Sequence, residues 1–141
     1  MKKHIKSFIN ESSVGLIATC DHQKPHAVPV YYLLIEAENA FYFMTKTASN
    51  SYLNLKNNGR ASITIFSEKP PTVYTANCES EILEFSTEEY SGIRKKLIAM
   101  HATEDYYPSP VSTLRKGELK LVKLNILDSN YQSYSHADDN E

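Results

Sequence analysis

The sequence has no tryptophan, only two cysteines and only four glycines among its 141 residues. Cys20 and Cys78 do not form a close pair, which excludes a disulfide-dense scaffold. The low glycine content excludes a collagen-like fibre. No apolar run of about 18 residues is present, so no helix that crosses a membrane and no membrane partner are expected.

Positive charge is not in excess, because Lys and Arg number 15 against 17 Asp and Glu, giving a net charge of -2. Nucleic-acid-binding domains usually carry a basic excess, so no nucleic-acid partner is expected. The basic residues at the start, from Lys2 to Lys6, are not followed by an apolar stretch of signal-peptide length. Together with two cysteines that suit reduced core thiols, this predicts a cytoplasmic protein.

The self-contained motifs of catalysis and nucleotide binding are also missing. The sequence has no Gly-x-Ser-x-Gly elbow, no Walker loop, no Gly-x-Gly-x-x-Gly and no His-Glu-x-x-His. The histidines are scattered, with no pair at metal-ligand spacing: His4, His22, His26, His101 and His136. No metal site and no individual catalytic side chain are therefore predicted.

Hydrophobic residues make up 41% of the chain and charged residues 23%, as in an ordinary globular domain. Apolar residues at spacings of three and four predict a helix over 2–11, and Ser49 suits the cap of a helix over 50–58. Alternating or β-branched segments predict strands over 15–20, 25–35, 40–45, 60–66, 72–85 and 118–127.

This order of elements predicts a mostly β fold, a small barrel of six or so antiparallel strands with flanking short helices, although periodicity alone leaves a sandwich open. One domain is expected over 1–127, followed by a polar, flexible tail over 128–141. Pro29 indicates an edge strand or a bulge, and the sequence suits a bend near Asn77. A break in alternation at Val122 predicts a bulge, and Ser86 with Glu89 predicts a capping box before a third helix.

Four segments follow one another in an order that resembles the pyridoxamine 5′-phosphate oxidase-like family of flavin-binding split barrels. They read PHAVPVYY at 25–32, FYFMTKT at 41–47, SNSYLNLKNN at 49–58 and RASITI at 60–65. The resemblance covers roughly residues 8–85, and the last strand from Leu119 also suits the family. It implies a homodimer that binds FMN as its small-molecule ligand in a groove between the subunits.

The resemblance also implies which residues hold the cofactor. The second strand would contact the isoalloxazine ring, largely through its backbone, with Val28, Pro29, Val30 and Tyr31. The end of the third strand and the following helix N-terminus would bind the phosphate with Thr45, Lys46, Thr47, Ser49, Asn50 and Ser51. Hydroxyls and unpaired amides at a helix N-terminus suit an anion, and Lys46 adds a positive charge.

The sequence departs from the family at four positions where cations are typical. Asn50 and Ser51 stand in place of an Arg-Lys pair, and Val28 and Leu33 replace the two cations of the second strand. Charge-assisted hydrogen bonds to phosphate are about twice as strong as neutral ones, so weaker FMN binding is expected. The oxidation of pyridoxamine phosphate itself is not expected.

Two functional hypotheses follow. The first is an FMN-dependent oxidoreductase of unknown substrate. The alternative is a non-catalytic, stress-related binding protein that has lost or weakened its FMN site, or that binds another flat cofactor, haem or a deazaflavin. A haem would need an axial ligand, for which His26 and His101 are the candidates.

Most of the same residues also have an ordinary structural explanation. Strand aromatics such as Tyr31, Tyr32 and Phe41 usually pack in cores or interfaces. His26 suits a hydrogen-bonded strand histidine, and Ser49 serves as a helix cap with the same geometry that would bind phosphate.

Overall fold

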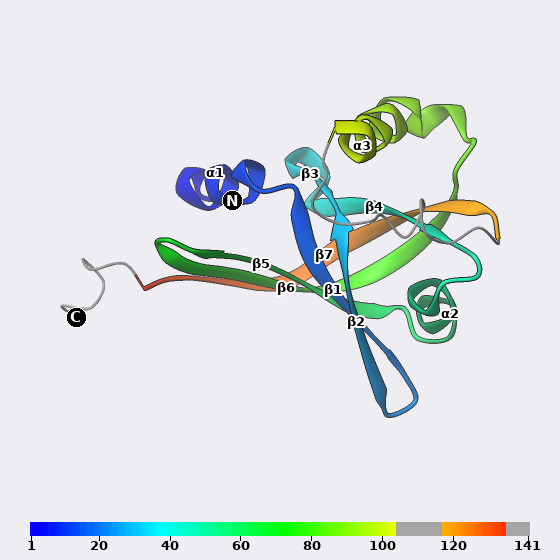
Figure 1. Cartoon of the computed structure of the whole chain (residues 1–141), viewed down its shortest axis with the longest axis horizontal. Helices are drawn as coiled ribbons and strands as arrows, with labels where there is room; N and C mark the ends of the chain where they lie inside the picture. The colour runs from blue at the N-terminus through cyan, green and yellow to red at the C-terminus, as the bar shows by residue number, and fades with distance from the viewer. Residues whose placement is uncertain (104–116, 135–141) are drawn as a thin grey trace.

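A computed structural model describes residues 1–103 and 117–134, and the side chains of 101–103 are also outside the description (Figure 1). The last residues of the predicted tail and the side chain of His101 therefore lie outside the described residues. Among the described residues, no helix is long and apolar enough to cross a membrane.

Within the residues that the structure describes, seven antiparallel strands form one sheet with the order β2-β1-β5-β6-β7-β4-β3. Their bounds are β1 Val14–Asp21, β2 Lys24–Tyr31, β3 Leu33–Ile35, β4 Ala40–Lys46, β5 Arg60–Glu68, β6 Pro71–Glu84 and β7 Leu119–Ser133. The two end strands, β2 and β3, are separated in sequence by Tyr32 alone. The chain itself therefore closes the sheet into a barrel, which confirms the predicted mostly β barrel.

Tyr32 divides the strand that was predicted over 25–35 into β2 and β3. Its backbone N–H donates to the carbonyl of Ser13 at 3.1 Å, and its hydroxyl donates to the carbonyl of Ile9 at 2.5 Å. Its side chain packs in the barrel core. The prediction of one continuous strand was wrong at this point, because alternation of residue types does not show that the two halves pair with different strands. The edge position predicted from Pro29 is confirmed, since β2 is an end strand of the sheet.

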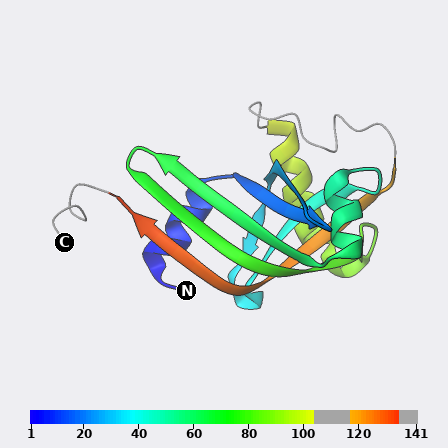
Figure 2. The ribbon, with the colours of Figure 1, turned by 90° about the horizontal axis from the view of Figure 1, so that it is seen from below.

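The helices are α1 Lys3–Glu11, α2 Asn50–Asn57 and α3 Ser91–Thr103, with 3-10 turns η1 Glu36–Glu38 and η2 Glu88–Tyr90. Figures 1 and 2 place α1 at one end of the molecule, near the turn between β5 and β6, and α2 at the other end. Burial of Ile9 holds α1 against the barrel.

The predicted capping box before α3 is not formed. Thr87, between Ser86 and the η2 turn, is the N-cap of that turn and makes no side-chain capping hydrogen bond. Arg94 orders the segment instead, because its Nη1 donates to the carbonyls of Phe85 at 2.7 Å and Thr87 at 2.9 Å. The Ser-x-x-Glu spacing does not show that an arginine one turn into α3 forms hydrogen bonds with the segment before the helix.

The predicted bulge at Val122 was also wrong. Leu121 and Val122 are both fully buried because β7 is covered on its two faces. Val122 points into the barrel with Phe41 and Phe43, whereas Leu121 packs with Leu97 of α3. The break in alternation therefore arises because Leu121 and Val122 are buried in two different cores, and not because a residue is inserted.

The register of β6 and β7 does shift, but further along the strands. Asn77 lies opposite Asp128 and Cys78 opposite Ile126, which leaves Leu127 as the extra residue. This confirms the predicted bend near Asn77. Beyond it β7 continues to Ser133, so the predicted start of a flexible tail at 128 was wrong. Residues 128–133 are mostly exposed, and their polar composition concealed a strand that pairs with β6.

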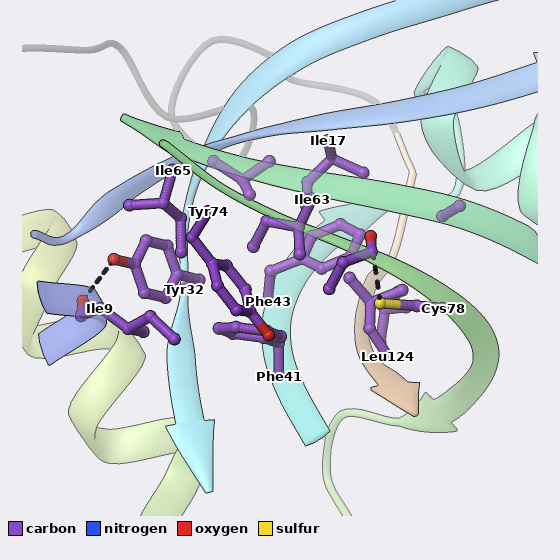
Figure 3. Close-up of a cluster of buried hydrophobic side chains, with 14 of the residues drawn as sticks. Ile9, Ile17, Tyr32, Phe41, Phe43, Ile63, Ile65, Tyr74, Cys78 and Leu124 are labelled. Carbon is purple, nitrogen blue, oxygen red and sulfur yellow. Dashed lines mark hydrogen bonds between the residues drawn. The ribbon is translucent and has the colours of Figure 1, made fainter. Parts of the chain in front are cut away.

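The barrel interior is filled by aromatic and β-branched side chains from nearly every strand (Figure 3). Tyr32, Phe41 and Tyr74 form a chain of rings, with centroids 5.6 Å and 6.1 Å apart. The interior is therefore a packed core, and any ligand must bind on the outside of the barrel.

Candidate functional site

The predicted phosphate-binding residues meet at one corner, where β4 ends and α2 begins. Ser49 is the N-cap of α2, and its Oγ accepts from the N–H of Tyr52 at 3.0 Å. The same Oγ lies 2.7 Å from Oγ1 of Thr45, and both side chains are buried. This prediction of a capping serine is confirmed, and the cap also ties the helix to the last buried residue of β4.

A second segment supports the corner from the far end of the chain. Thr47 and Glu118 form two hydrogen bonds of 3.0 Å, from the Thr47 N–H to the Glu118 carbonyl and from the Glu118 N–H to Thr47 Oγ1. Gly117 has a φ of +97°, and a Cβ there would lie 2.7 Å from Thr47 Oγ1 and 2.8 Å from the Ala48 amide. Sequence reasoning missed Gly117 and Glu118, although a lone glycine just before the last strand is a signal for such a turn.

The buried side of α2 fixes the helix to β1. Asn54 Nδ2 donates to Thr19 Oγ1 at 3.0 Å, and both side chains are buried. Ser51, one turn earlier on the helix, is only 4% exposed. Thr19 and Asn54 were not predicted, and polar residues three apart on one helix face are their only sequence signal.

The corner therefore offers neutral donors and one ammonium group. The N–H groups of Asn50 and Ser51 are in the first turn of α2 and have no intrahelical acceptor. The side chain of Asn50 is exposed, whereas that of Ser51 is not. Lys46 is half-buried at the end of β4. These groups fit a phosphate through amides, hydroxyls and Lys46, although with less positive charge than the family pattern provides.

The predicted ring-binding strand lies beside this corner, because α2 packs against both β1 and β2. Val30 is buried in the barrel core and cannot present its side chain to a ligand, whereas Val28 packs against the core and is only partly buried. Tyr31 is 3% exposed, and Pro29 is half-buried opposite Leu16 of β1. Contacts from β2 to a flat ring would therefore be made mainly by its backbone and by Pro29.

His26, a candidate axial ligand of the haem alternative, is not placed in a ligand-like cluster of described residues. His26 is half-buried on β2, opposite Thr19, and is not part of a core cluster. Within the described ranges, no three His, Cys, Asp or Glu side chains are grouped as a metal site would require. The haem prediction stays untested, since the side chain of His101 lies beyond the described part of the chain.

The comparisons with known proteins identify the family and the fold of the chain. The family model of pyridoxamine 5′-phosphate oxidase matches residues 1–126 of the chain. No curated protein matches the sequence.

Several solved structures share the fold at low sequence identity. An FAD-binding protein from Mesorhizobium loti has a TM-score of 0.75 at 12% identity, with 94% of this chain and 93% of that chain covered. A pyridoxamine 5′-phosphate oxidase-related, FMN-binding protein from Nostoc punctiforme has a TM-score of 0.65 at 12% identity, with 94% and 84% covered. General Stress Protein 26 from Bacillus anthracis has a TM-score of 0.67 at 16% identity, with 90% and 89% covered.

The match to the family model spans both the corner at Thr45–Ser51 and the edge strand β2. The chain therefore belongs to the pyridoxamine 5′-phosphate oxidase-like family of flavin-binding split barrels.

Proposed function

We propose that this protein binds FMN at the corner between β4 and α2 and acts as a flavin-dependent oxidoreductase. The observation that carries the proposal is the hydroxyl pair of Thr45 and Ser49 at the N-terminus of α2, beside the edge strand β2. It combines an anion-binding helix end with an adjacent extended backbone, and the family to which the chain belongs binds flavins.

The chain's own residues would position the cofactor. The amides of Asn50 and Ser51 would donate to the phosphate, and Lys46 would contribute a positive charge. The backbone of β2 would orient the ring. The bound flavin would supply the redox chemistry, since no side chain of the corner is placed as a general acid or base.

The proposal is tested by titrating FMN and riboflavin separately into the purified protein from which any bound flavin has been removed. Recognition of the phosphate by the corner predicts that FMN binds at least about tenfold more tightly than riboflavin. Equal affinity for the two ligands would show that the corner does not bind phosphate.

A positive charge introduced at the exposed position 50 makes the comparison of FMN with riboflavin more decisive. Asn50→Arg adds a cation in the first turn of α2 and is expected to tighten FMN binding about tenfold, with riboflavin unchanged. Asn57→Arg, at the other end of the same helix, is the matched control and should leave the FMN affinity unchanged. Ser51 is unsuitable for this purpose because its buried side chain leaves no room for lysine.

A second candidate function is a non-catalytic binding protein with a weakened flavin site. The neutral, exposed Asn50 at the phosphate corner favours it. In this case the wild-type protein would not bind FMN at micromolar concentration, whereas Asn50→Arg would. Tight binding by the wild type would contradict this candidate.

We also propose that the protein is a homodimer, through the outer face of the β1, β5 and β6 strands. The pairing registers place Leu16, Thr64 and Thr75 in one row across these strands, and Ala18, Ser62 and Asn77 in the next. None of the six is charged, and depletion of charge is typical of the centre of a subunit interface. Pro29 and Ala27 of β2 extend the two rows, so the face adjoins the proposed flavin strand.

A further inference from the structure

His26 is a half-buried histidine of the edge strand β2, on the face of the sheet that α2 covers. The strand register places it opposite Thr19 of β1, so the two side chains are on the same face. Thr19 contacts α2, because its Oγ1 accepts a hydrogen bond from Nδ2 of Asn54 at 3.0 Å. Since α2 packs against β2 as well as β1 (Figures 1 and 2), His26 lies beside the middle of this helix.

The N-terminus of α2 is one helical turn from this position. Asn50 precedes Asn54 by four residues, so the first-turn amides begin about 6 Å along the helix from the level of His26. A histidine side chain and a phosphate bound at those amides can span this distance together. Between His26 and the corner, the same face of β2 presents only Val28 and Val30, which are apolar. His26 is therefore the nearest side chain of this face that can carry a charge.

The imidazole of His26 has no partner among the described residues. It forms no hydrogen bond, ion pair or ring contact with them, in contrast to His22, whose Nε2 lies 3.7 Å from Oδ1 of Asp21. A half-buried imidazole has lost part of its hydration, so a hydrogen bond to a ligand would compensate it. The ring is therefore available to an anion bound at the end of the helix.

Little negative charge surrounds His26. The elements β1, β4, α2 and α3 pack against β2, and within their described residues Asp21 is the single carboxylate. No carboxylate forms an ion pair with His26, so an anionic ligand would be its main source of favourable charge. The cations of these elements and of β2 are Lys24, Lys46, Lys56, Arg94, Lys95 and Lys96, and α2 also carries the phenol of Tyr52.

We propose that protonated His26 binds the phosphate of FMN, so that flavin binding at the corner strengthens as the pH falls through the neutral range. The inference rests on the proposed function, because it requires the phosphate at the N-terminus of α2. Histidine is the side chain whose charge ordinarily changes between pH 5 and 8, and its protonated ring donates a charge-assisted hydrogen bond. A phosphate with a second pKa of about 6 carries close to two negative charges above pH 7, which Lys46 alone does not balance.

Titration of FMN and riboflavin into the flavin-free protein at two pH values tests the inference. A coupling of about tenfold between the proton and the phosphate predicts that the wild type binds FMN about fivefold more tightly at pH 6.5 than at pH 9. Riboflavin, which has no phosphate, should bind with the same affinity at both pH values.

Two substitutions of His26 separate the charge of this side chain from its shape. His26→Gln keeps a polar, neutral side chain and should bind FMN no more tightly at pH 6.5 than at pH 9. His26→Lys is charged at both pH values and should bind FMN about tenfold more tightly than the wild type at pH 9.

His22→Asn is the matched control in the turn before β2. The His22 side chain is 93% exposed, and asparagine tolerates its φ of +54°. This variant should keep the wild-type pH dependence of FMN binding. Equal thermal unfolding midpoints establish that all three variants fold.

The titration of the His26 ring protons, followed by NMR, gives a readout that does not depend on the measured affinities. By reciprocity, saturating FMN should move the midpoint of that titration upward by about one pH unit, whereas riboflavin should leave it in place. A midpoint that FMN does not move would overturn the inference.

The outcomes distinguish this inference from the proposed function. If His26→Gln retains the wild-type pH dependence, or if the wild type prefers FMN to riboflavin equally at both pH values, the inference is wrong and the flavin site stands. If the wild type binds FMN and riboflavin alike at both pH values, the corner does not bind phosphate and both proposals are wrong.

Discussion

Two tyrosine hydroxyls are buried in the barrel, and only one of them has an acceptor in the described structure. Tyr32 is 2% exposed and donates to the Ile9 carbonyl, whereas Tyr74 is 1% exposed and its hydroxyl has no hydrogen-bond partner there. Burial is the main cause that raises the pKa of both hydroxyls. The two residues thus differ in hydrogen bonding at nearly equal burial.

Replacement of each tyrosine by phenylalanine should therefore have different effects. Tyr32→Phe removes a buried hydrogen bond and should lower the free energy of unfolding by about 1 kcal/mol. Tyr74→Phe removes an unsatisfied polar group and should leave stability unchanged or raise it. Urea denaturation of the two variants beside the wild type measures both changes. A larger loss for Tyr74→Phe than for Tyr32→Phe would contradict this description of the core.

The thiol of Cys78 predicts a loss of stability at alkaline pH. Burial, assisted by the charge of Asp128, raises the pKa of Cys78 from the usual 9.0 to about 12. Between these values the native state retains a proton that the unfolded state releases, so stability falls as pH rises. The contribution of one such group approaches about 1.4 kcal/mol per pH unit.

Cys78→Ala removes this contribution, although it lowers overall stability through the lost packing. Denaturation measured between pH 8 and 11 should show a shallower decline for Cys78→Ala than for the wild type. Parallel curves for the two proteins would show that the thiol titrates as an exposed group does.

At the scale of elements, Ser49 of α2 is expected to affect both the stability of the protein and the proposed ligand site. This residue caps the helix at the Tyr52 amide and lies against Thr45. Its two roles can be separated, because aspartate also caps helices but repels a phosphate. Variants of Ser49 are therefore expected to rank differently in stability, which depends on helix capping, and in FMN affinity, which depends on anion binding.

Ser49→Ala should lower the free energy of unfolding by about 1 kcal/mol and should also weaken FMN binding. Ser49→Asp should preserve stability while reducing the FMN affinity by at least about tenfold. Thermal unfolding and FMN titration on the same samples measure the two effects. Normal FMN affinity in Ser49→Asp would place the phosphate elsewhere.

The strand β4 shows why local sequence patterns predicted the strand itself but not the elements that pack against its two faces. Phe41 and Phe43 enter the barrel, while Tyr42 and Met44 lie beneath α3, so consecutive residues are all buried. An uninterrupted apolar run is compatible with either a central strand or a buried helix segment, and short turns on both sides favoured the strand. The second core under α3 depends on a helix almost 50 positions later, which no window of sequence contains.

At the scale of the whole molecule, the uncharged face centred on Thr64 predicts the oligomeric state. Thr64→Lys places a charge at the centre of both copies of the proposed two-fold interface and should convert the proposed dimer into monomers. Ser86→Lys, at an exposed position before η2, is the matched control. Size-exclusion chromatography with light scattering distinguishes the states. A dimer that persists in Thr64→Lys would exclude this face as the interface.

The sequence by itself determined the helix capped by Ser49 and the edge position of the strand with Pro29, because these depend on local capping and residue type. The order of four segments gave the resemblance to the family, whereas periodicity alone left both a barrel and a sandwich open. The tertiary structure decided the rest. It placed Gly117 and Glu118 beside Thr47, because strand pairing joins segments that are distant in the chain. It also buried Ser51 while leaving Asn50 exposed, since the direction of each side chain depends on how α2 packs against β1.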